Sequence, residues 1–309
     1  MSEQNPPEKR ESNTARDTSR DDWMHLGKTQ GQRTAESVAA MRMRLVPTQE
    51  NKALSRYSGD VQVNIIAGLA KGTFERQATY PVMRSRLFQS IIAPTVPPPG
   101  AGYTPILVEI ASGFSPNGLA IARRWPYAQI IEIDLPDVVR EKQRRLKDGN
   151  IPVPPNMSWR EADLGITPLV QVLDGLVADV VLAEGLMMYF SLEEQKQIAQ
   201  YVSQCLKPGG LYIFDVGTQE AMDRIVKESG AAAMEFFIKQ SGGFPGLFKT
   251  TGEIKALFTG AGYARVDVHI PSEVAEPLDD VPKPISDIAL IVAARKGDLQ
   301  TTIAPATVT

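Results

Sequence analysis

The stretch ILVEIASGFSPNGLA, residues 106–120, decides the fold of this 309-residue chain. An apolar run typical of a buried strand leads into a turn of small residues. A helical pattern follows, with Ser115 as its predicted cap and Pro116 at its first position. Strand, tight turn and helix in this order are typical of a βα unit that binds a nucleotide, where the helix N-terminus favours an anion.

The turn has too few glycines for a dinucleotide. The G-x-G-x-x-G pattern places Ala111 and Pro116 at its first and third glycine positions, so only Gly113 fits and NAD or FAD is disfavoured. No G-K-[ST] follows, which argues against a P-loop. Gly118 leaves room beside the helix. The turn suits a ligand with a carboxylate and a ribose but no phosphate, and a purely structural turn is the alternative.

Acidic residues follow the next two predicted strands. Asp134 stands 21 positions after Gly113 (134 − 113), the spacing of a carboxylate that binds ribose hydroxyls, although it could instead cap the next helix. Asp163 could accept a hydrogen bond from an adenine amino group while Leu164 covers the ring. A helix cap or a loop acid is the alternative for Asp163.

The fourth predicted strand ends in AEGLMMYFS. Glu184 follows it directly, and its partner would be a cation such as an amino-acid ammonium. Met187, Met188 and Tyr189 would form an apolar wall of the site, or belong to the ordinary core.

Strands alternate with helices from residue 106 onward, which predicts a doubly wound, mostly parallel α/β sheet of the Rossmann-like type. KPGG (207–210) reads as a turn, and the last two strands, with no helix between them, predict an antiparallel hairpin at one edge. The predicted strands are 106–110, 129–133, 157–162, 178–183, 211–216, 264–270 and 288–294.

The chain divides by composition. We expect a disordered polar arm at 1–22, a helical cap at 23–95 with a helix beginning at Thr34, and a core at 96–296 after the linker PTVPPPGAGYTP. The core would carry a lid insert at about 229–249, rich in Phe and Gly. A loose tail at 297–309 would end the chain.

Composition limits the partners. The net charge is −3 with no long basic block, so we expect no nucleic-acid partner, and no apolar run is long enough for a membrane span. The single cysteine, Cys205, is consistent with a reducing, cytoplasmic location. It and the two histidines, His25 and His269, predict no metal site. The oligomeric state stays open.

The ordered motifs EIASGFS, EIDLP, EADLG, AEGLMMYFS and LKPGGLYIFD resemble those of class I S-adenosylmethionine-dependent methyltransferases. AEGLMMYFS and IEIDLPDVV are similar to the leucine carboxyl methyltransferase family, and ASGFSPNG to its polyketide O-methyltransferase branch, of the tetracenomycin-tailoring type. The resemblance covers residues 30–295. The sequence departs from the family pattern at two positions. The family turn GAG reads ASG here, and Ala111 fits this turn only if its φ is negative. Gln89 replaces an aspartate that often follows the arginine run, which is MRSRLF here.

The resemblance implies S-adenosylmethionine as cofactor, with the methionine part over Gly113, the ribose on Asp134 and the adenine on Asp163 and Leu164. Arg84 would pair with the cofactor carboxylate, and Glu184 and Tyr189 would line the methyl-transfer site. The implied cofactor-binding residues are Arg84, Glu109, Ala111, Gly113, Ser115, Asp134, Leu135, Asp163, Leu164, Glu184 and Tyr189.

We therefore expect in-line methyl transfer to an oxygen of a small polyketide-like or carboxylic acid acceptor, in secondary metabolism. An ionised carboxylate needs no base, and no histidine stands beside a cofactor motif, so no catalytic residue is assigned. Carboxyl methylation of a protein C-terminus and a non-catalytic cofactor-binding scaffold are the alternatives.

Overall fold

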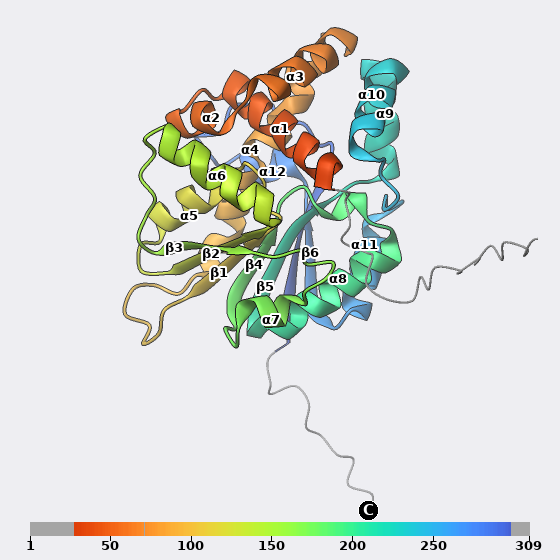
Figure 1. Cartoon of the computed structure of the whole chain (residues 1–309). Helices are drawn as coiled ribbons and strands as arrows, with labels where there is room; N and C mark the ends of the chain where they lie inside the picture. Colours follow the sequence, from red (N-terminus) through yellow and green to blue (C-terminus); the bar gives the residue numbers. More distant parts are fainter. Residues whose placement is uncertain (1–27, 71, 298–309) are drawn as a thin grey trace, which may run out of the picture.

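A seven-stranded sheet of the order β3-β2-β1-β4-β5-β7-β6 forms the centre of the molecule, which a computed structural model describes for residues 28–70 and 72–297 (Figure 1). β1 to β5 pair in parallel, whereas β7 is antiparallel to both β5 and β6. The α/β prediction with an antiparallel edge is thus confirmed. The strands are β1 (Ile106–Ile110), β2 (Gln129–Asp134), β3 (Met157–Glu161), β4 (Ala178–Ala183), β5 (Leu206–Val216), β6 (Tyr263–His269) and β7 (Leu290–Lys296).

Helices cover both faces of the sheet because successive strand residues point to opposite sides. In β1, Leu107 belongs to the apolar core under α4, α5, α6 and α12, while Val108 belongs to the core under α7, α8 and α11. These helices are α4 (Phe74–Ile92), α5 (Asn117–Arg124), α6 (Pro136–Asp148), α7 (Leu169–Leu173), α8 (Leu192–Cys205), α11 (Thr251–Gly260) and α12 (Pro271–Ala275), with 3-10 turns η2 (Ala93–Thr95) and η3 (Met187–Tyr189).

A helical cap lies over the end of the sheet where the parallel strands finish (Figure 1). It consists of α1 (Lys28–Leu45), α2 (Gln49–Leu54), α3 (Tyr57–Leu69) and the first half of α4. α1 and α3 cross closely at Gly59, where a Cβ atom would lie 2.4 Å from Glu36 O. The crossing therefore needs glycine.

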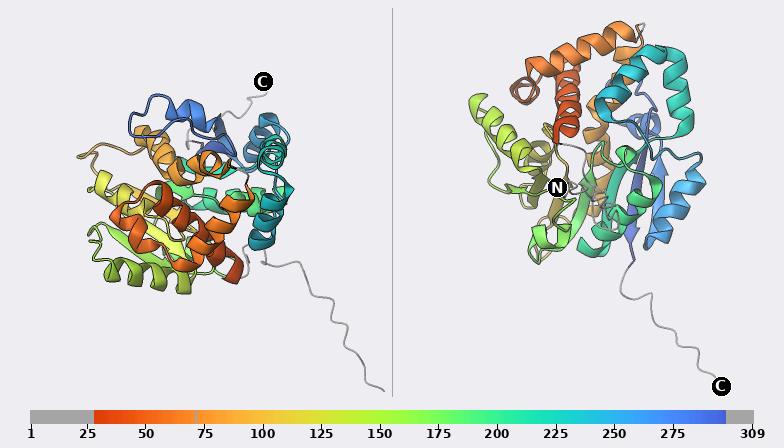
Figure 2. Two further views of the ribbon diagram at one scale, coloured as in Figure 1. Left: turned by 90° about the horizontal axis from the view of Figure 1, so that it is seen from above. Right: turned by 45° about the vertical axis from the view of Figure 1, so that its right-hand side comes forward.

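Two helices that follow β5 pack beside this cap, and the second of them falls within the expected insert at 229–249. α9 (Gln219–Ser229) and α10 (Ala231–Ser241) follow β5, and Figure 2 shows them beside the cap helices. Ala233 and Phe236 of α10 pack into the same apolar cluster as Ala40, Val63 and Phe74 of the cap. Segments that lie far apart in the sequence thus enclose one space above the sheet.

Three local predictions were wrong. Thr34 lies inside α1, which begins at Lys28. KPGG lies within β5, where the register with β4 shifts between Ala178 and Val180, so that Gly209 adopts a φ of +72° as part of a bulge. The short helix α12 stands between the last two strands, which the sequence pattern joins directly.

Other local predictions are confirmed. Ser191 and Glu194 form the expected capping box of α8, and Cys205 is buried. No helix among the described residues is long and apolar enough to cross a bilayer. The predicted arm 1–22, His25 and the tail beyond residue 297 lie outside the described residues.

Candidate cofactor and acceptor site

A cavity of about 310 Å³ lies between the cap and the carboxyl ends of the parallel strands. The strand order reverses between β1 and β4, and crevices at such a switch point are where open α/β sheets bind ligands. All but one of the eleven predicted cofactor residues line this cavity. Those that do are Arg84, Ala111, Gly113, Ser115, Asp134, Leu135, Asp163, Leu164, Glu184 and Tyr189.

Glu109 is the exception, since it lies beneath the turn and does not line the cavity. Its side chain is buried in β1, where Oε1 accepts a hydrogen bond from Asn117 Nδ2 at 3.1 Å and Oε2 has no partner. Burial, together with the nearby carboxylates Glu132 and Glu184, raises the pKa of Glu109 to about 8. Gln89 also belongs to this buried polar chain and donates to Asn117 Oδ1 at 3.1 Å, which links α4 to α5. Glu109 therefore supports the turn from below.

The turn after β1 is left-handed at two positions. Gly113 has a φ of +50°, and Ala111 has a φ of +52°, so the negative φ that would let the turn accommodate alanine without strain is not present. Alanine in this region is strained, because its Cβ approaches the following carbonyl oxygen. Ser115 Oγ accepts the Asn117 amide at 3.2 Å, but α5 begins at Asn117 and its N-cap is Pro116, so the predicted cap at Ser115 and first helical position at Pro116 were wrong by one residue.

Asp134 holds this turn in place. Its Oδ2 accepts the Gly113 amide at 2.7 Å and its Oδ1 accepts the Leu135 amide at 2.7 Å. Burial raises the pKa of Asp134 to about 6 even though the two amides lower it. Because each carboxylate oxygen can accept a second hydrogen bond, Asp134 can still receive hydroxyl donors from the cavity.

Asp163 and Leu164 line the cavity beyond Asp134. Asp163 Oδ1 accepts the Gly165 amide at 3.1 Å, which orders the loop after β3. Leu164 packs on the apolar core below α7 and α8. The two residues thus offer a carboxylate beside an apolar surface.

A buried ion-pair network joins the cap to the sheet at Glu184. Its carboxylate contacts the guanidinium of Arg42 from α1, Arg84 Nε at 3.0 Å and Ser85 Oγ at 2.6 Å. Burial alone would raise the pKa of Glu184, but Arg42 and Arg84 lower it below its ordinary value. The predicted cationic partner of Glu184 is thus supplied within the protein by two arginines.

Arg84 also bridges to Asp215, the penultimate residue of β5. Arg84 Nη1 lies 3.1 Å from Asp215 Oδ2, and Tyr80 donates to the same oxygen at 3.2 Å. Gly185, with a φ of +67°, makes room for this arrangement, because a Cβ there would lie 2.3 Å from Arg84 Nη2. Sequence reasoning missed Arg42 and Asp215. Asp215 had a signal of the same kind as Asp134, namely an acid at the carboxyl end of a buried strand.

The three residues after β4 that were expected to form an apolar wall lie in two places, the cavity and the core. Met188 and Tyr189 line the cavity, whereas Met187 is fully buried in the core. The Tyr189 ring lies 5.6 Å from the ring of Phe244, measured between centroids, so the segment after α10 closes over it. Burial raises the pKa of Tyr189 to about 12.

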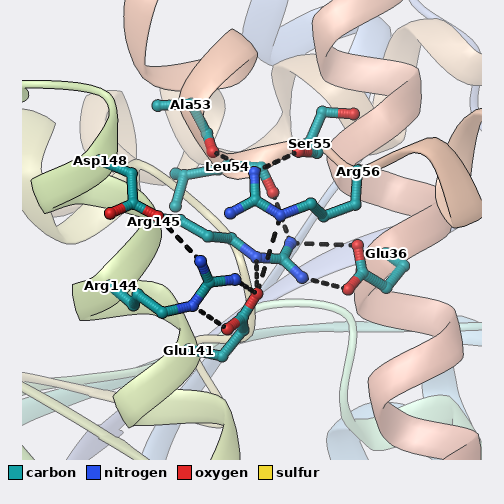
Figure 3. Close-up of polar contacts among 9 residues, drawn as sticks. All are labelled: Glu36, Ala53, Leu54, Ser55, Arg56, Glu141, Arg144, Arg145 and Asp148. Atoms are coloured by element: carbon teal, nitrogen blue, oxygen red, sulfur yellow. Dashed lines mark hydrogen bonds and ion pairs between the residues drawn. The ribbon is translucent and has the colours of Figure 1, made fainter.

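Arg145 of α6 contacts both the cap and the turn after β1, and Figure 3 shows its contacts with the cap. It makes two hydrogen bonds to the Glu36 carboxylate in α1 and donates to Leu54 O at 2.6 Å. The guanidinium is buried and lies 3.8 Å from the centroid of the Phe114 ring, which lines the cavity. Arg145 therefore positions both α1 and the turn around the ligand space.

The sheet, its reversal point and the acidic cavity edge define a Rossmann-like α/β fold of the S-adenosylmethionine-dependent methyltransferase class. Residues 30–203 match the family described as leucine carboxyl methyltransferase, which is more than half of the chain. The chain belongs to the leucine carboxyl methyltransferase family. A comparison with curated proteins finds no match.

Several solved structures are similar to this chain at low sequence identity. A possible exported protein from Bordetella parapertussis is 15% identical with a TM-score of 0.52, over 87% of this chain and 97% of that one. An O-methyltransferase family protein from Burkholderia thailandensis is 18% identical with a TM-score of 0.46, over 76% and 63%. An O-methyltransferase family 2 protein from Planctomyces limnophilus is 13% identical with a TM-score of 0.48, over 77% and 61%. This chain spans less than two thirds of the length of the last two proteins.

The cofactor of this family is S-adenosylmethionine, and the residues at the cavity fit it. Ser112 lines the cavity, and its buried Oγ has no hydrogen-bond partner in the protein, as expected of a turn that receives a polar ligand group. Carboxylates at the ends of β2 and β3 stand beside apolar Leu135 and Leu164, which suits a ribose and an adenine ring. Among the described residues, no group of acidic, histidine or cysteine side chains could hold a metal ion.

Proposed function

We propose that this protein is an S-adenosylmethionine-dependent O-methyltransferase that methylates a small, largely apolar acceptor. The observation that carries the proposal is the continuity of one cavity from the acids at the sheet edge to an apolar chamber under the cap. The chamber is lined by side chains from the cap and from the segment after β5. They include Val38, Met41, Ile66, Phe74, Met222, Ile225 and Leu247.

We assign each residue a role from its place along the cavity. Asp134 binds the ribose hydroxyls, Asp163 and Leu164 bind the adenine, and Gly113 lets the methionine part approach the turn. Arg42 and Arg84 lie beside Glu184 and Asp215, a mixed-charge surface that suits the zwitterionic amino-acid group of the cofactor. Bound S-adenosylmethionine supplies a methyl group already activated by the sulfonium.

The chain then contributes alignment and exclusion of water. Tyr189, with its pKa raised to about 12, and Tyr80, with its pKa raised by burial well above its ordinary value, hold their protons at neutral pH and are not bases. Glu184 is held by two arginines, and His269 does not line the cavity. Within the described residues, the site therefore favours an acceptor oxygen that is ionised by itself, such as a carboxylate or an acidic phenol.

The test is transfer of a labelled methyl group from S-adenosylmethionine to a panel of aromatic carboxylic acids, acidic phenols and neutral alcohols. We expect labelling of acids or acidic phenols but not of the alcohols. Peptides ending in a free carboxylate form a separate arm, because carboxyl methylation of a protein C-terminus would label only these.

Asp134→Asn is the matched variant, since it keeps the shape and removes the charge. It should lose affinity for S-adenosylhomocysteine in calorimetry, with NAD as a control that binds neither protein. If S-adenosylhomocysteine binds the wild type and no acceptor in any arm is labelled, a non-catalytic binding role replaces the proposal.

A further inference from the structure

Arg42 of α1 is a buried cation that lines the cavity and leaves most of its hydrogen-bond donors unused. Its side chain is 5% exposed, and one nitrogen, Nη2, contacts Glu184 Oε1. Within the described part of the chain, Nε and Nη1 of Arg42 donate to no acceptor, and the protein encloses neither atom completely. Arg145 is also buried, but all three of its nitrogens donate to acceptors in the protein. A buried guanidinium with open donors points to a ligand that completes it.

The charge of Arg42 is compensated only in part. Burial acts to lower the pKa of Arg84, but its two carboxylate partners, Asp215 and Glu184, raise this pKa above its ordinary value. Arg42 contacts Glu184 alone, and burial lowers the pKa of Arg42 below its ordinary value. The two arginines thus differ by one carboxylate partner, and Arg42 is the one that can accept another.

The open donors lie at the cofactor end of the cavity. Arg42 Nη2 and Arg84 Nε contact the same oxygen, Glu184 Oε1, the latter at 3.0 Å, so both guanidinium groups flank one point directly after β4. Ala35 stands seven residues before Arg42, on the same face of α1, and its Cβ would lie 3.3 Å from a Cβ at Gly113. One face of α1 therefore meets both the turn after β1 and the acid after β4, where the strand order reverses.

We propose that Arg42 is a second ligand of the cofactor's carboxylate, which it shares with Arg84. A carboxylate has two oxygens and can accept from two guanidinium groups at once. Arg42 Nη2 stays on Glu184, while Nε or Nη1 donates to the cofactor. The first helix of the cap thereby becomes part of the cofactor site. This inference rests on the proposed function, because it assigns a further residue to the cofactor end of the same cavity.

The test compares S-adenosylhomocysteine with decarboxylated S-adenosylhomocysteine, which lacks only the carboxylate. Both are titrated by calorimetry. We expect the wild type to prefer S-adenosylhomocysteine by about 100-fold, since each of two charged hydrogen bonds is worth about tenfold in affinity. Arg42→Met should lower this preference to about tenfold, because only the ligand with the carboxylate loses a contact. Effects of the variant on adenine, ribose or ammonium binding change both affinities and cancel in the ratio.

Arg44→Met is the matched control, because Arg44 also lies on α1 but pairs with Glu75 at the surface, and this variant should keep the wild-type preference. Arg42→Lys keeps the ion pair with Glu184 and serves where Arg42→Met does not fold. Its preference should fall by at least about threefold, since an ammonium held by Glu184 lacks the open fork of arginine.

An unchanged preference in the folded Arg42 variant would overturn the role of Arg42, as would equal binding of the two ligands by the wild type. Failure of S-adenosylhomocysteine to bind the wild type would instead overturn the proposed function.

Discussion

The guanidinium of Arg145 lies 3.8 Å from the centre of the Phe114 ring while it pairs with Glu36 of the cap. One buried side chain thus contacts both the cofactor turn and the helix that closes over it. Both charges of this pair are shielded from water, with 2% and 9% of the Arg145 and Glu36 side chains exposed. Removing Arg145 therefore leaves Glu36 as a buried charge without this counterion, whereas removing Glu36 leaves Arg145 with Glu141 alone.

Arg145→Met should lower the free energy of unfolding by about 3–5 kcal/mol. Glu36→Gln should also destabilise, and the double variant should lose less than the sum of the two, because no unpaired charge remains. Urea unfolding of the four proteins measures this coupling. Arg144→Met is the control, since Arg144 pairs with Glu141 and Asp148 at the surface and its loss should change stability little. Strict additivity of Arg145→Met and Glu36→Gln would contradict a coupled pair.

Ala111→Gly should stabilise the protein by about 1 kcal/mol, because it relieves a left-handed alanine at a φ of +52°. Chemical denaturation measures the change. Ala120→Gly, at an exposed interior position of α5, is the opposite case and should destabilise by about 1 kcal/mol. Loss of stability in both variants would mean that Ala111 is unstrained.

Glu109→Gln should become increasingly stabilising as the pH rises. The pKa of Glu109 is raised to about 8, so the folded protein favours the protonated form. The stability that this group contributes is present below its unfolded pKa of about 4.3 and is lost as the pH rises through 8. Glutamine mimics the protonated form at every pH. Thermal midpoints of wild type and variant should therefore be similar near pH 5 and diverge toward pH 9.

Glu193→Gln, on the exposed first turn of α8, controls for general effects of removing a negative charge. The thermal midpoint of Glu193→Gln should equal that of the wild type at every pH between 5 and 9. A constant offset between Glu109→Gln and wild type at all pH values would show that Glu109 does not titrate in this way.

Affinity for S-adenosylhomocysteine should fall below about pH 6, where Asp134 becomes protonated. The ionised carboxylate is the stronger acceptor for ribose hydroxyls, and a hydrogen bond to a charged group is worth about tenfold or more in affinity. Calorimetric titrations between pH 5 and 8 measure the effect. Asp134→Asn should bind weakly and with no such pH dependence, and a variant that retained the wild-type profile would assign the titration to another group.

Local pattern determined the order of the strands and helices, the capping box at Ser191 and the acids that follow the parallel strands. These features depend on residues a few positions apart, such as an apolar run followed by a turn, so they can be read along the chain. Nine of the eleven predicted cofactor residues line the cavity for this reason, since the ends of parallel strands meet at one edge. The tenth that lines it, Arg84, lies on α4 and was expected from the family resemblance.

Tertiary structure decided which charges meet and which backbone angles the turn adopts. Arg42 and Glu184 are 142 positions apart and Arg84 and Asp215 are 131 apart, and no periodicity specifies such partners. The positive φ of Ala111 is a property of the whole turn. α10 packs against the cap because its apolar side chains are buried in one cluster with those of α1 and α3. The site forms because residues far apart in the sequence pack together and bury these arginines beside these carboxylates. The strand–turn–helix pattern can be recognised in the sequence, but this packing cannot.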